Sequence, residues 1–80
     1  RIELSRTEYD LLRFFIRNRG RVLSRERILD GVWGYDAAVA PRTIDFHVMG
    51  LRRKLEDDPA APRHFLTAPT LGYRFEGGDA

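Results

Sequence analysis

Apolar residues in the first quarter of the chain recur with the period of an α-helix. This stripe consists of Leu11, Leu12, Phe15 and Ile16. Upstream of it, Ser5 and Glu8 have the residue types and the spacing of a capping box, in which each side chain accepts a hydrogen bond from the backbone of the other. The pattern predicts a helix that begins at Arg6 and ends before Gly20, a residue suited to the left-handed conformation that follows a helix.

A second stripe with helical spacing follows a short extended stretch, residues 21–23. Its apolar members are Ile28, Leu29, Val32 and Trp33. Ser24 precedes the stripe as a suitable N-cap, and Gly34 is expected to end the helix. Residues 35–40 show no period and are mostly small, so we expect a surface loop that Pro41 closes in the first turn of a third helix.

The third helix is expected over about residues 42–56, and it has two different faces. Its core-facing residues are spaced i, i+4, i+7 and i+11 and are Ile44, Val48, Leu51 and Leu55. At about 100° per residue, the outward positions are Arg42, Thr43, Phe46, Met49, Gly50 and Arg53, flanked by Asp45 and Arg52. The outward face is therefore the candidate surface for contact with a ligand.

The last quarter of the chain has the alternation and turn residues of a β-hairpin. Two short β-like runs, 64–67 and 72–75, are joined by residues 68–71, which is the length of a compact hairpin loop. Short strands at 2–4 and 21–23 are expected to pair with this hairpin. Three helices followed by a hairpin wing over about 64–76 predict an α+β fold of the winged helix-turn-helix class.

The composition limits the domain organisation and the compartment. A chain of 80 residues with 42% hydrophobic residues can bury one modest core, so we expect one domain over residues 1–80. It has no cysteine, which excludes a disulfide framework and fits a reducing cytoplasm. No apolar run approaches the roughly 18 residues that a membrane span needs, and we expect no membrane segment.

The net charge by itself does not indicate a phosphate-binding protein, but the predominance of arginine among the basic residues is compatible with one. The net charge is +2, and thirteen of the fourteen basic residues are arginine, the exception being Lys54. The planar donor fork of arginine suits phosphate recognition, but a genome rich in G and C explains the same choice equally well.

The sequence offers little to a catalytic or metal-dependent function. It contains no His-Glu-x-x-His segment, no glycine-rich phosphate loop and no nucleophile with a partnered base at a recognisable spacing. Its two histidines, His47 and His64, are far apart and lack carboxylate or thiol neighbours at ligand spacing. We therefore expect neither an enzyme nor a bound metal or cofactor.

Six blocks of the sequence carry a resemblance to a known family. They are residues 4–12, 21–26, 32–35, 42–48, 51–55 and 72–75. In this order and spacing the chain resembles the DNA-binding effector domain of OmpR/PhoB-type response regulators, and residues 56–65 resemble KdpE-type members. The resemblance implies sequence-specific binding of double-stranded DNA, with the third helix in the major groove and the wing near the minor groove.

The resemblance also implies partners outside this segment. A receiver domain in cis and a short sheet would precede the segment, with residues 2–4 as the last strand of that sheet, and a sensor kinase would act through the receiver. The loop 35–40 would touch RNA polymerase, and two copies would bind DNA as a tandem dimer at the bacterial nucleoid.

Roles carried over from the family define a candidate DNA-binding set. Positions that match phosphate contacts are Trp33, Arg42, His47, Arg52 and Tyr73, and positions near base edges are Thr43, Asp45 and Phe46. The set is completed by Met49, Gly50, Arg53 and Thr67. The chain departs from the family pattern where Met49 and Gly50 replace two basic residues and where Pro69 replaces the arginine of the wing. We expect weaker or differently specified binding.

Several of these residues have a structural interpretation beside the functional one. Gly50 either permits close approach to DNA or occupies a tolerant surface site, and His47 is either a phosphate donor or a packed, neutral histidine. Trp33 is expected in the core first, with its indole N–H free for a phosphate. Lys54 is expected to bind a phosphate or to interact with Asp57 or Asp58 near the helix end.

Two outward groups leave a choice of ligand. Phe46 and Met49 are expected either to touch thymine methyl groups or to cover a protein partner, with packing under the wing as a further alternative for Phe46. Asp45 is expected either to orient Arg42 or to accept from a cytosine amine. The sequence thus supports two functions, a sequence-specific transcription regulator and a winged-helix interaction module that has lost duplex reading.

Overall fold

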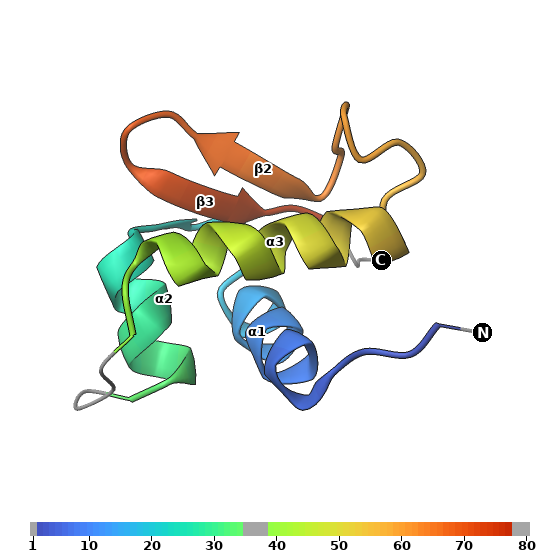
Figure 1. Cartoon of the computed structure of the whole chain (residues 1–80). Helices are drawn as coiled ribbons and strands as arrows, with labels where there is room; N and C mark the ends of the chain where they lie inside the picture. Colours follow the sequence, from blue (N-terminus) through green and yellow to red (C-terminus); the bar gives the residue numbers. More distant parts are fainter. Residues whose placement is uncertain (1, 35–38, 78–80) are drawn as a thin grey trace.

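The computed structural model describes residues 2–34 and 39–77 of the chain. Its elements are α1 (Arg6–Arg17), β1 (Val22–Leu23), α2 (Arg25–Val32), α3 (Arg42–Leu55), β2 (Phe65–Ala68) and β3 (Gly72–Phe75). Figure 1 shows the hairpin β2–β3 along one side of α3, with α1 and α2 on the other side in this view. The predicted α+β winged helix-turn-helix is confirmed.

The first two helices begin and end where the sequence predicts. Ser5 Oγ accepts from the backbone N of Glu8 at 3.1 Å, and Glu8 Oε1 accepts from the backbone N of Ser5 at 2.9 Å, so the capping box is complete. Ser24 Oγ likewise caps α2 at the backbone N of Arg27. Gly20 and Gly34 follow α1 and α2 with φ of 82° and 102°, a region that favours glycine.

The third helix starts at Arg42, as the sequence predicts. Pro41 lies at the N-cap with helical backbone angles and no side-chain capping bond, so the helix proper begins at Arg42. The backbone carbonyl of Pro41 accepts a hydrogen bond from the backbone N–H of Ile44 at 3.0 Å, so the first turn forms without a capping side chain. The fixed φ of proline suits this entry.

The sheet has three antiparallel strands in the order β1-β3-β2. Leu23 of β1 pairs with Tyr73 of β3, and Thr67 of β2 pairs with the same tyrosine from the other side. The predicted strand at residues 2–4 is wrong for this structure, because a strand needs a neighbour and these residues pair with no strand of the described chain.

One core joins the helices to the sheet. Its buried members are Leu11, Phe15, Leu23, Ile28, Ile44, Val48, Leu51, Phe65, Tyr73 and Phe75. Phe15 of α1 meets Phe65 edge-on at a centroid distance of 5.7 Å and stacks on Phe75 at 6.3 Å. This core fixes α3 against the hairpin. Within the described residues, no helix is long and apolar enough to cross a membrane.

Candidate nucleic-acid interface

The side of α3 that faces away from the core carries four exposed residues at i, i+4, i+7 and i+11. They are Arg42, Phe46, Met49 and Arg53, and we refer to them as the outer stripe. Phe46 is 69% exposed and Met49 is 51% exposed, values that are high for large apolar side chains. The outer stripe has the spacing of the core stripe but is offset from it by two residues, or about 200° around the axis, so the two stripes lie on opposite sides of one helix. The outer stripe has a cation at each end and an apolar middle.

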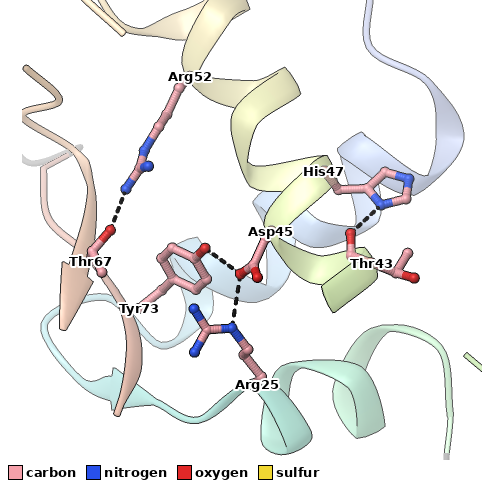
Figure 2. A network of polar contacts seen from close by, with 7 residues as sticks. All are labelled: Arg25, Thr43, Asp45, His47, Arg52, Thr67 and Tyr73. Atoms are coloured by element: carbon pink, nitrogen blue, oxygen red, sulfur yellow. Dashed lines mark hydrogen bonds and ion pairs between the residues drawn. The ribbon is translucent and has the colours of Figure 1, made fainter. Parts of the chain in front are cut away.

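On one flank of this stripe, Asp45 joins three elements of the fold (Figure 2). Its Oδ1 accepts from Arg25 Nε of α2 at 2.8 Å and from the Tyr73 hydroxyl of β3 at 2.5 Å. The guanidinium of Arg25 also lies over the Tyr73 ring at 5.2 Å. Asp45 therefore orients Arg25, and the expectation that it orients Arg42 is wrong.

These contacts change the acid–base properties of the two partners of Asp45. The carboxylate of Asp45 raises the pKa of Arg25 above its ordinary value. Burial, and then the bond to Asp45, raises the pKa of Tyr73. Tyr73 is only 5% exposed and donates its hydroxyl proton to Asp45, so this proton is engaged within the fold.

Arg52, on the same flank, fastens the wing to α3. Its Nε and Nη2 both donate to the carbonyl of Phe65, at 2.9 and 2.5 Å, and Nη2 also donates to Thr67 Oγ1 at 2.9 Å. Figure 2 shows the side chain of Arg52 extending from α3 to this threonine. Most of the guanidinium is thus engaged within the fold, and it sets the distance between helix and hairpin.

The opposite flank of α3 packs against α1 through a buried carboxylate. Glu8 is 8% exposed and accepts from Lys54 Nζ at 2.6 Å, and the same ammonium donates to the carbonyl of Glu3 at 3.0 Å. The hydrogen bond from Lys54 and the backbone bond from Ser5 lower the pKa of Glu8. The expected partners of Lys54, Asp57 and Asp58, are therefore wrong.

The same carboxylate explains the glycine in the middle of α3. A Cβ at Gly50 would lie 2.6 Å from Glu8 Oε2, closer than side-chain atoms normally come. Gly50 therefore faces α1 and does not face outward as predicted, and it admits the ion pair of Glu8 and Lys54. This packing offsets the cost of about 1 kcal/mol that glycine carries in a helix interior.

His47 lies between the outer stripe and α2, in a packed position. Its Nδ1 is 3.0 Å from the carbonyl of Thr43, and its ring lies 5.4 Å from that of Trp33. A carbonyl only accepts, so Nδ1 carries a proton and is engaged within the fold. Trp33 packs against the core and stays half-buried, as the core-first interpretation predicts.

Two residues important for this surface received no functional role from the sequence. Arg25 follows the N-cap of α2. It lies inside residues 21–26, one of the blocks that resemble the family, and this block is the sequence feature that could have drawn attention to it. Glu56 ends α3 and is 7% exposed, with Oε1 accepting from the backbone of Arg63 at 3.0 Å and Oε2 from those of His64 and Phe65, both at 2.8 Å. Glu56 thereby ties the end of α3 to the start of the wing.

We expect Asp45→Ala to destabilise the fold by about 1–2 kcal/mol, because Arg25 and Tyr73 lose their shared acceptor while solvent at this half-exposed pair reduces the effect. Urea unfolding followed by circular dichroism measures the change. Asp45→Asn, which keeps an oxygen for Tyr73, should lose less. Equal stability of the alanine variant and the parent chain would show that this network does not hold the three elements together.

Within the described residues, no group of three or more histidine, aspartate or glutamate side chains is arranged to hold a metal ion. The exposed side of α3 carries an arginine at each end of the outer stripe, and the hairpin β2–β3 lies beside this helix and is hydrogen-bonded to it. Such an arrangement defines a winged helix-turn-helix domain.

The family model for the C-terminal domain of transcriptional regulatory proteins matches residues 1–75. The chain belongs to this family, whose members are transcription regulators rather than enzymes. Among curated relatives, RegX3 of Mycolicibacterium smegmatis, a sensory transduction protein, is 49% identical over 76 residues, which are 95% of this chain and 33% of the relative. KdpE of Mycobacterium tuberculosis, a transcriptional regulatory protein, is 43% identical over 75 residues, covering 94% of this chain and 33% of KdpE.

Solved structures agree with this membership. The response regulator DrrB of Thermotoga maritima, an OmpR/PhoB homologue, superposes with a TM-score of 0.86 at 36% identity, covering 96% of this chain and 35% of DrrB. The DNA-binding domain of Klebsiella pneumoniae RstA, in complex with the RstA box, gives 0.80 at 27% identity, covering 92% of this chain and 73% of that one. The chain spans about a third of the length of the curated relatives it matches. The OmpR/PhoB resemblance is confirmed, and KdpE is among the relatives.

Proposed function

We propose that the chain binds double-stranded DNA sequence-specifically and regulates transcription as the output domain of a two-component response regulator. The observation that carries the proposal is the outer stripe, in which Arg42 and Arg53 flank the exposed residues Phe46 and Met49. Of the two grooves of B-DNA, the major groove is the one wide enough to admit an α-helix. Membership in a family of transcriptional regulators and the DNA complex of RstA support it.

The proposed interface uses the outer stripe and the hairpin beside it. α3 enters the major groove with the outer stripe, and the hairpin β2–β3 lies near the adjacent minor groove. Around the stripe, Trp33, Thr43, His47 and Thr67 are the bordering residues proposed to approach the phosphate backbone. Asp45, Arg52 and Tyr73 act through the fold, because their polar atoms hold the wing and α2 in place.

The longer protein is part of the proposal. We infer a receiver domain before this segment, a sensor kinase that acts through it, and tandem binding of two copies on DNA in the bacterial cytoplasm, at the nucleoid. The loop over 35–40 is the inferred contact for RNA polymerase, and its residues 35–38 lie outside the described residues.

Duplex binding by this chain tests the proposal. Fluorescence anisotropy with a labelled promoter duplex, a random duplex and the matching single strand, at low salt, should give binding to both duplexes and tighter binding to a cognate promoter. Arg17→Ala, which removes an exposed arginine at the end of α1, serves as the control and should bind as the parent does. An absence of duplex binding at low salt would favour the winged-helix interaction module instead.

A further inference from the structure

The middle of the outer stripe has no polar side chain to offer a base edge. Phe46 and Met49 are the exposed residues there, and two of their polar neighbours, Asp45 and Arg52, are bonded into the fold. Asp45 is bonded to α2 and β3, and Arg52 is bonded to the wing. Gly50 has no side chain and faces α1. At positions 46, 49 and 50 the helix therefore offers no hydrogen-bonding side chain to a base.

The surroundings of the apolar pair select an anionic ligand. Arg42 lies one turn before Phe46, and Arg53 lies one turn after Met49, both exposed. Met49 also borders a hollow of about 370 Å³ whose walls include Arg52 and Arg53. An apolar protein surface would leave these cations without partners, whereas a DNA groove places phosphates on both sides of an apolar contact.

One apolar group is presented in the major groove by an unmodified base pair, the C5-methyl of thymine. Residues three apart on a helix have Cβ atoms about 5–6 Å apart, and bases of one strand follow each other at about 3.4 Å. Phe46 and Met49 can therefore lie over neighbouring base steps. Resting on the function proposed above, we propose that this pair reads C5-methyl groups of adjacent pyrimidines, with no hydrogen bond to the bases.

The proposal has a chemical consequence that separates it from hydrogen-bond readout. A surface that detects only the methyl group cannot tell thymine from 5-methylcytosine at that point of the groove. Removal of the methyl, as in uracil, lowers the affinity, and its addition to cytosine raises it. Burying one such carbon changes the affinity by about fourfold.

The test uses a duplex that the chain itself selects from a random pool, in which each thymine is replaced in turn by uracil and each cytosine by 5-methylcytosine. The expected result is a loss of about fourfold at one or two neighbouring thymines and a similar gain where a methylated cytosine takes such a place. In Phe46→Ala and Met49→Ala the difference between thymine and uracil should shrink towards onefold. Ile16→Ala removes an exposed apolar side chain of α1 and should keep the difference.

The outcomes distinguish this inference from the function on which it rests. Duplex binding with its salt dependence intact, but with uracil tolerated at every thymine, overturns the methyl reading and leaves DNA binding standing. A thymine-to-uracil loss that both alanine variants retain assigns the reading to other residues and also overturns it. No duplex binding at all would overturn both. The uracil series uses the unmodified chain, so it is independent of how the variants fold.

Discussion

Replacing Glu56 by alanine is expected to destabilise the domain by about 3 kcal/mol, the largest effect we expect from a single polar side chain. Its carboxylate accepts three backbone hydrogen bonds at the start of the wing, and the N–H of the buried Phe65 would be left without an acceptor. A domain of 80 residues is stable by roughly 4–12 kcal/mol in total, so this loss is a large fraction. Denaturant unfolding measures it.

The carboxylate of Glu56 also makes the free energy of unfolding depend on pH in a defined direction. Burial alone would raise the pKa of Glu56, but the bonds from the backbone of Phe65, Arg63 and His64 outweigh burial and lower it from the ordinary value of 4.5. A lowered pKa in the folded state means that the stabilisation is present above that ordinary value and is lost as the pH falls through the folded-state pKa. The parent chain should therefore lose stability below about pH 4.5, and Glu56→Ala should lose less over the same range.

Asp57→Ala provides the matched control for this prediction. Asp57 follows Glu56 in the chain and is exposed, so its removal should change the stability by no more than about 0.5 kcal/mol. If Glu56→Ala were as stable as Asp57→Ala, the tie between the end of α3 and the wing would not contribute to the fold.

The double variant Arg42→Ala, Arg53→Ala is expected to have the largest effect on DNA binding. Each arginine that neutralises a phosphate multiplies the affinity by about eightfold at about 0.1 M salt, so the loss of both should weaken binding about 60-fold. Both side chains are exposed at the ends of the outer stripe, and no hydrogen bond within the described fold holds them, so folding should be unaffected.

The salt dependence of binding and a control variant test this prediction. The slope of log K against log salt should fall by about 2 in the double variant, since two phosphate contacts are lost. Arg17→Ala with Arg13→Ala removes two exposed arginines of α1 and should leave the slope unchanged. Unchanged affinity in the Arg42 and Arg53 variant would mean that the outer stripe does not enter the groove, even if DNA is bound elsewhere on the domain.

Much of the fold could be predicted because local rules decide it. The capping box of Ser5 and Glu8, the N-cap Ser24 and the apolar stripe of α3 each depend on residues within one or two turns. The strand predicted at 2–4 failed for the opposite reason, since a strand depends on a neighbour that the sequence pattern cannot supply. Periodicity places a residue on a helix face but does not say what packs against that face.

The candidate site shows the same division. Periodicity placed Arg42, Phe46, Met49 and Arg53 outward, and the structure agrees. It also placed Gly50 outward, because the angular position of a glycine does not reveal that the carboxylate of Glu8, 42 positions earlier in the chain, fills the space beside it. Long-range partners of this kind also decide the roles of Lys54, bonded to α1, and of Asp45, bonded to α2 and β3.

These long-range contacts alter what the surface can do. Residues that the family resemblance assigned to DNA, such as Tyr73 and Arg52, hold the wing to α3 and so set the angle at which helix and hairpin meet a duplex. The contacts that remain for the phosphates come from fewer groups. Weaker nonspecific binding, with base reading by apolar contact, is the combination that this surface favours.

A salt titration of duplex binding tests the central claim most directly. Arg42 and Arg53 alone should give a slope of log K against log salt of about −2 for a cognate duplex, each further phosphate that the domain neutralises should add about −0.9, and the affinity for random duplex should stay measurable at low salt. A slope near zero, or no binding to any duplex at low salt, would contradict the claim that this domain places α3 in the major groove of DNA.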